Sequence, residues 1–175
     1  MLAMSRSLAA RHMSIAAPAA KEQYRATAED RLLEHLRRVA EKNHTDGKVQ
    51  EATEMYQHLV GARRAQNGDN HPLTVQAIGA LARVACEAGE HSTAETLARE
   101  ASATSKNILG ALHPASLMHQ STLASVLAQQ GKLDEAENHA REALSGFTTL
   151  FGDDHEDVHS ARTRLHEVLS AQQGA

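Results

Sequence analysis

A repeat of 42 residues constrains this 175-residue chain more than any other feature. Three segments align without gaps at that spacing and begin at Gly68, Gly110 and Gly152: GDNHPLTV, GALHPASL and GDDHEDVH. Other small and apolar residues keep the same period: Gly47, Gly89 and Gly131; Ala52, Ala94 and Ala136; Ala40, Ala82 and Ala124; Leu81, Leu123 and Leu165. So many coincidences in one register indicate a true internal repeat, whose units fold alike and stack on their neighbours.

Each period contains two segments with the pattern of a helix. The first opens at His71-Pro72, where proline has no amide partner to lose, and ends at Gly89, because glycine adopts a left-handed conformation without steric cost. Apolar residues recur between them at three- and four-residue steps, as Val75, Ile78, Leu81, Ala82 and Ala85 do. The second segment, residues 91–108, carries a similar stripe. One period is therefore predicted to form an antiparallel helical hairpin.

The repeat predicts an all-α, right-handed α-solenoid of about three and a half hairpins over residues 30–172. The predicted hairpins cover 30–66, 71–108 and 113–150, and a single capping helix lies near 156–171. Alanines at equivalent positions, such as Ala94 and Ala136, allow the helices to approach closely.

Composition excludes several classes of protein. The net charge of -4 argues against binding nucleic acid through bulk positive charge. One cysteine, Cys86, excludes a disulfide framework and a multi-cysteine zinc site. No stretch approaches the roughly 18 consecutive apolar residues of a membrane-spanning helix.

Residues 1–29 differ in composition from the repeats. They are rich in alanine and serine and contain Arg6 and Arg11, with no acidic residue before Glu22. A basic leader without acids is typical of organelle-targeting segments, which predicts a mitochondrial location. The alternative is a tail of no special role on a cytoplasmic protein.

The repeats resemble the tetratricopeptide repeat, in its 42-residue kinesin-light-chain-like variety. The resemblance covers roughly residues 30–172 and includes the phrase GKLDEAENHAREAL at 131–144. The positions that carry it are Leu81-Ala82, Leu123-Ala124, Ala94, Ala136, Tyr56, His71-Pro72 and His113-Pro114. In place of the asparagine pair that precedes the leucine in kinesin light chains, this chain has Gly79-Ala80 and Ser121-Thr122.

The resemblance implies a non-catalytic scaffold for protein–protein interaction. We expect a structural or assembly subunit of a larger complex, such as a respiratory complex, ATP synthase or mitochondrial ribosome. A cytosolic peptide-binding or cargo adaptor is the alternative. The partner surface is predicted on first-helix residues that lie one step off the core stripe: Arg37, Glu41, Gln76, Arg83, Met118, Ser121, Ser125 and Gln129. This polar, weakly charged set suits a protein surface better than a nucleic acid.

Histidines are the candidates for a metal site. His155, His159 and His166 fall within about 40° of one another on a helix, and such a cluster can bind zinc. The simpler interpretation is that His71, His113 and His155 cap the starts of helices, and that His159 packs at a position held by Val75 and Leu117 in other repeats. No motif of a catalytic nucleophile or phosphate-binding loop occurs. We therefore predict no enzyme activity, no cofactor and no metal.

Overall fold

The computed structural model describes residues 28–174, which form seven helices and no strand. A first helix occupies 28–45 of the described chain. The others are α2 (Val49–Asn67), α3 (Pro72–Glu87), α4 (His91–Leu109), α5 (Pro114–Gln129), α6 (Leu133–Phe151) and α7 (Glu156–Gly174). The predicted hairpins and the single last helix are confirmed to within a few residues. Residues 1–27 of the predicted leader lie outside the described residues.

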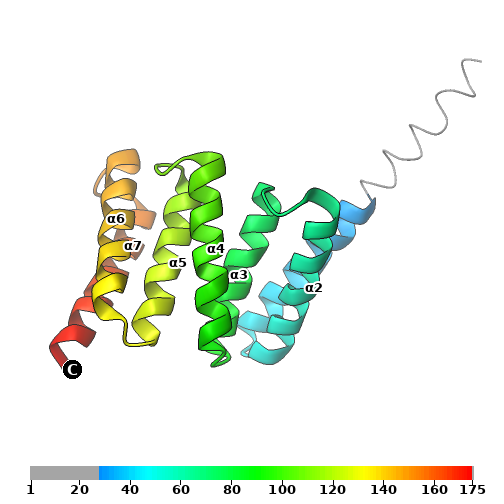
Figure 1. Ribbon diagram of the computed structural model, residues 1–175, viewed down its shortest axis with the longest axis horizontal. Coiled ribbons are helices and arrows are strands. Elements are labelled where there is room, and N and C mark those ends of the chain that lie inside the picture. Colours follow the sequence, from blue (N-terminus) through cyan, green and yellow to red (C-terminus); the bar gives the residue numbers. More distant parts are fainter. Residues whose placement is uncertain (1–27, 175) are drawn as a thin grey trace, which may run out of the picture.

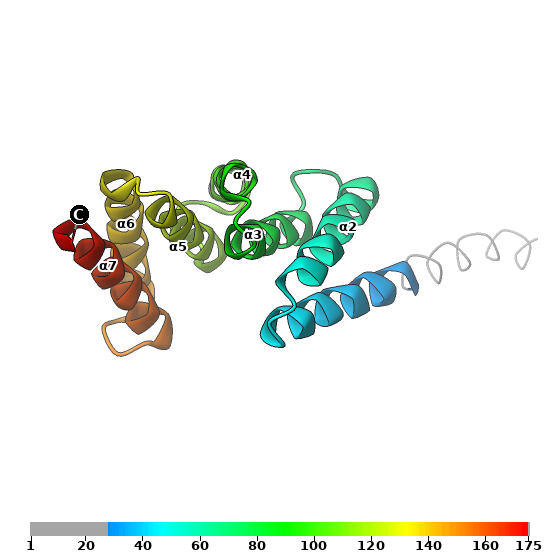
Figure 2. The ribbon, with the colours of Figure 1, turned by 90° about the horizontal axis from the view of Figure 1, so that it is seen from below.

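The hairpins stack side by side in chain order (Figure 1). We call helix 28–45, α3, α5 and α7 the inner helices, and α2, α4 and α6 the outer helices. The inner helices α3, α5 and α7 pack against one another in succession. Each of α4 and α6 packs against the two inner helices next to it in the chain, and α2 packs against α3. Seen from below, α2 and α4 lie on one side of the stack and helix 28–45 on the opposite side (Figure 2). The fold is therefore an all-α repeat solenoid.

The equivalent residues of successive repeats occupy equivalent environments. Ala52, Ala94 and Ala136 are fully buried on the outer helices, and Ala40, Ala82 and Ala124 are fully buried on the inner helices. Leu81, Leu123 and Leu165 are buried in step. Since alanine adds little bulk, these positions mark where the helices approach most closely. The 42-residue register predicted from the sequence is confirmed in the core.

Glycines and histidines set the turns between the helices. Both glycine series of the repeat have positive φ, from 76° at Gly47 to 93° at Gly110, a region that residues with a Cβ rarely adopt. At the end of α3, Glu90 N–H donates to the carbonyl of Ala85 at 2.9 Å, the longer bond of a Schellman turn. At the start of α5, the Nδ1 atom of His113 accepts from Ala115 N–H at 3.1 Å. The junction histidines therefore act as N-caps.

Candidate partner-binding groove

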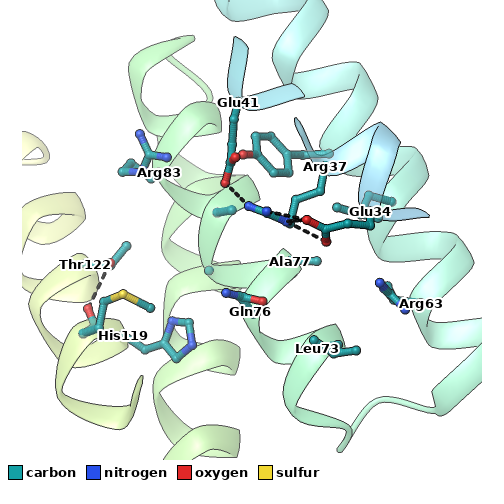
Figure 3. A pocket seen from close by; sticks show the side chains of 15 residues that line it. Glu34, Arg37, Glu41, Arg63, Leu73, Gln76, Ala77, Arg83, His119 and Thr122 are labelled. Carbon is teal, nitrogen blue, oxygen red and sulfur yellow. Dashed lines mark hydrogen bonds and ion pairs between the residues drawn. The ribbon is translucent and has the colours of Figure 1, made fainter. Parts of the chain in front are cut away.

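A cavity of about 200 Å³ opens on the inner helices, where helix 28–45 faces α2, α3 and α5. Its apolar wall comes from Leu59, Leu73, Ala77, Ala80 and Met118. Charged and polar side chains surround this wall: Glu34, Arg37, Glu41, Arg63, Gln76, Arg83, His119 and Thr122 (Figure 3). We call it the first cavity. A partner protein could place one side chain there.

Arg37 is held at the edge of the first cavity by two carboxylates. Its guanidinium donates to Glu34 through Nε at 3.0 Å and through Nη2 at 2.6 Å, and it also bonds to Glu41 (Figure 3). The hydrogen bond from Arg37 lowers the pKa of the Glu34 carboxyl, and the bond to Glu34 raises the pKa of Arg37. The three side chains form a preorganised polar rim for the cavity.

The other two arginines of the cavity are also engaged. Arg63, on α2, is buried and donates through Nη1 to Asp30 Oδ1 at 3.0 Å. Arg83, on α3, lies with Nη1 3.1 Å from the Nδ1 atom of His44 and 3.8 Å from the carboxylate of Glu87. Both are fixed in place by groups on neighbouring elements.

His119 is the lining residue that the sequence reasoning missed. It projects from α5 towards α3 and is 3% exposed, and its burial lowers the pKa of the imidazole to about 4. A signal for it existed in the repeat, because Ala77 and Ala161 stand at the equivalent positions 42 residues earlier and later. The first repeat has His35 at the equivalent position, but that side chain is exposed, so what distinguishes His119 is the burial of its imidazole.

A second cavity, of about 470 Å³, lies further along the inner helices between α3, α5 and α7. Arg164 of α7 donates through Nη1 to Ser125 Oγ at 2.7 Å. The thiol of Cys86 donates to Gln129 Oε1 at 3.2 Å. Arg83 and Thr122 line both cavities, so the two cavities adjoin, and we call them together the inner groove.

Seven of the eight predicted partner-surface residues line the inner groove. Arg37, Glu41, Gln76, Arg83 and Met118 line the first cavity, and Arg83, Ser125 and Gln129 line the second. Ser121 does not belong with them, because it is 6% exposed and lines neither cavity. Its equivalent one repeat earlier, Gly79, is buried in the contact with α5, so this register position faces a neighbouring inner helix.

The histidines proposed as metal ligands have other environments. The ring of His155 stacks on Phe151 with 4.3 Å between centroids, and its Nδ1 accepts from Asp157 N–H at 3.2 Å. His159 and His166 are exposed. The packing predicted for His159 is wrong, because its side chain is exposed although Val75 and Leu117 are buried at the equivalent positions. Within residues 28–174, no group of three or more histidine, cysteine or acidic side chains is placed to hold a metal ion.

Cys86 has the environment of a structural cysteine. The residue is buried at 3% exposure, and this burial, followed by the nearby Glu87 carboxylate, raises the pKa of the thiol. A raised pKa reduces the thiolate, which is the reactive form. The side chain therefore contributes packing to the groove wall, with its sulfur 3.2 Å from Gln129 Oε1 and 3.9 Å from His91 Nδ1.

None of the helices in residues 28–174 is long and apolar enough to span a membrane. Stacked helical hairpins with a groove along their inner helices define the class of α-solenoid repeat proteins, whose extended surfaces bind other molecules.

The chain belongs to the tetratricopeptide repeat family. Family models described as tetratricopeptide repeat match residues 31–107 and 116–157. The repeat is a scaffold for protein–protein interaction, and the resemblance identified in the sequence is confirmed.

Solved structures with the same fold include kinesin light chain TPR-like repeats from Podospora anserina, at 22% identity and a TM-score of 0.75 over 81% of this chain and 67% of that one. A point-mutant form of that protein matches with the same identity and TM-score over 66% of its length. BtubC (BKLC) from P. vanneervenii matches at 17% identity and a TM-score of 0.73, over 83% of this chain and 58% of its own. Among curated proteins, none matches this sequence.

Proposed function

We propose that this chain is a non-catalytic scaffold subunit that holds a partner protein in its inner groove, as part of a larger assembly. The observation that carries the proposal is the convergence of seven predicted surface residues on two adjoining cavities. Their side chains come from helix 28–45, α3 and α5, three consecutive inner helices. A partner that contacts all three helices must fit the curvature of the stack, so its selection depends on shape as well as on individual contacts.

The proposal is tested by affinity purification of the tagged full-length protein from the source cells. Met118→Arg places a long charged side chain at the mouth of the first cavity, and Met118 is 46% exposed, so the fold tolerates the change. Ala103→Arg makes the same change in charge at an exposed position on α4, outside both cavities. Partners should be retained by the wild type and Ala103→Arg and lost with Met118→Arg. An identical set of captured proteins with both variants would contradict a role for the groove.

Membership of an assembly is tested by the native mass of the endogenous protein. A subunit of a larger complex elutes far above the 18.9 kDa of the single chain. Elution at the mass of the free chain would instead support the alternative, an adaptor that binds its cargo transiently.

The proposed location of the assembly is the mitochondrion. It is supported by the composition of residues 1–29, where Arg6 and Arg11 occur without acidic neighbours. A fusion of residues 1–25 to a fluorescent reporter should accumulate in mitochondria, and the same fusion with Arg6→Glu and Arg11→Glu should not. A diffuse signal from the unaltered fusion would contradict the location and favour a cytoplasmic protein.

A further inference from the structure

His119 and Gly79 form a pair in which each residue explains the other. An alanine Cβ built at Gly79 would overlap Nδ1 and Cε1 of the His119 ring, so only glycine leaves room for the imidazole. A glycine inside a helix costs about 1 kcal/mol relative to alanine. The equivalent positions in the other repeats are Arg37, Ser121 and Thr163 for Gly79, and His35, Ala77 and Ala161 for His119. Gly79 therefore lowers the stability of α3 but leaves room for the imidazole of His119 beside the first cavity.

The imidazole is available for a hydrogen bond that this chain does not make. No hydrogen bond joins the His119 ring to any other residue between 28 and 174, although the ring is 3% exposed and lines the first cavity. Its lowered pKa, about 4, keeps the ring neutral at physiological pH, with one nitrogen as donor and the other as acceptor. Within residues 28–174, Ser116 Oγ is the buried side-chain atom without a hydrogen-bond partner, so the His119 nitrogens are not sealed off from the cavity, and a ligand group in the cavity can bond to them.

Charges around the first cavity are already compensated. Arg37 bonds to Glu34 and Glu41, and Arg63 bonds to Asp30. Arg83 lies between His44 and Glu87. A charged group entering the cavity would have to disrupt one of these ion pairs. An uncharged group would not, and it would also suit the apolar wall.

We propose that the first cavity takes an uncharged side chain of the partner protein that carries a hydroxyl or amide, and that this group bonds to His119. The inference rests on the proposed function, because it assigns the chemistry of the partner at the same groove. A hydroxyl or primary amide offers both a donor and an acceptor, so it complements the neutral imidazole in either tautomer. The specificity of the site therefore lies in a neutral hydrogen bond rather than in an ion pair.

A random peptide library displayed on phage provides the probe, with the purified full-length protein as the target. Enriched peptides should share a serine, threonine, tyrosine, asparagine or glutamine at one position and show no enrichment of acidic residues. Their affinity, measured by calorimetry, should change less than about twofold between roughly 0.05 and 0.5 M NaCl, because no ion pair is formed. Replacing the shared residue by its apolar counterpart, such as threonine by valine, should weaken binding about tenfold.

The decisive variant is Gly79→Ala together with His119→Ala. It gives both positions small side chains, as the equivalent pair Ser121 and Ala161 has, so we expect it to fold. It should bind the selected peptides about tenfold more weakly or worse. His119→Gln, which retains a neutral donor and acceptor, should recover part of the affinity. The control is His58→Ala, at an exposed position on α2 outside both cavities, which should leave binding unchanged.

Two outcomes would overturn the inference. Selection of acidic peptides whose affinity falls steeply with salt and does not depend on His119 would show that an ion pair recognises the partner. Failure of the library to yield any peptide that distinguishes the wild type from the double variant would show that the imidazole binds nothing. In either case the proposed function stands as long as Met118→Arg still abolishes capture of native partners.

Discussion

At the scale of single residues, three equivalent buried positions near the starts of the inner helices differ in whether they carry a hydroxyl and whether that hydroxyl has a hydrogen-bond partner. Thr74 is fully buried and donates from Oγ1 to the carbonyl of Arg63 at 3.3 Å. Ser116 is buried too, but its Oγ has no hydrogen-bond partner within the described chain. Val158, fully buried at the third position, has no hydroxyl to satisfy. The repeat thus contains a satisfied, an unsatisfied and an apolar version of the same site.

We predict that Ser116→Val stabilises the protein by about 1 kcal/mol, because it removes an unsatisfied buried hydroxyl and adds apolar volume. Thr74→Val should have the opposite effect, with a loss of about 1 kcal/mol, because it removes a hydrogen bond that is made. Urea unfolding measures both through the midpoint at constant slope. Destabilisation by both substitutions would mean that Ser116 is satisfied in solution.

His119 predicts a dependence of stability on pH. The imidazole binds a proton near pH 4 in the folded chain and near 6.5 in the unfolded chain, so the unfolded state holds more protons between these values. The contribution of this group to the free energy of unfolding is therefore complete above about pH 6.5 and falls, by up to about 3 kcal/mol, as the pH drops towards 4. Carboxylates at the cavity, such as Glu34 with its lowered pKa, also contribute less to the free energy of unfolding as they become protonated in acid.

The contribution of His119 is isolated by comparing the wild type with His119→Ala between about pH 4 and 7. The variant lacks the imidazole but retains the carboxylates, so its unfolding free energy should change less over this range. Parallel curves for the two proteins would contradict a buried neutral ring.

At the scale of elements, the turns depend on glycine for backbone conformation alone. Gly131 follows α5 with φ of +76°, and Gly61 lies within α2, and a Cβ would meet no atom within 4 Å at either position. Because neither glycine has an atom that would obstruct a Cβ, substitutions at the two positions differ only in the backbone conformation that alanine must adopt. We predict that Gly131→Ala costs about 1 kcal/mol and that Gly61→Ala gains about 1 kcal/mol. Thermal unfolding should move the melting temperatures in opposite directions, and a shift of the same sign in both would show that packing decides.

At the scale of the whole molecule, ion pairs connect the outer helices of successive repeats. Arg99 of α4 bonds to Glu135 of α6 at 2.7 Å, and Arg64 of α2 bonds to Glu100 of α4 at 2.5 Å. The side chains are 34–42% exposed, so water and salt screen them. These pairs align neighbouring hairpins more than they stabilise them.

We predict a coupling of about 0.5 kcal/mol between Arg99 and Glu135 in a double-mutant cycle at low salt, and almost none in about 1 M NaCl. The measurement is the unfolding free energy of Arg99→Ala, Glu135→Ala and the double variant under both conditions. A coupling that persists in high salt would indicate a pair shielded from solvent.

The sequence by itself determined the solenoid and its register, because a 42-residue period fixes which residues of each unit are alike. Alike residues such as Ala94 and Ala136 can then be buried only in alike contacts. It also predicted seven residues that line the inner groove, since the step off the core stripe follows from helical geometry.

Only the tertiary structure decided how departures from the period are accommodated. His119 and Gly79 are 40 residues apart, and their mutual fit depends on how α3 and α5 cross. The exposure of His159 and the burial of Ser121 likewise depend on which helices pack beside them. Periodicity constrains what repeats share, whereas side-chain contacts between different repeats require the three-dimensional packing.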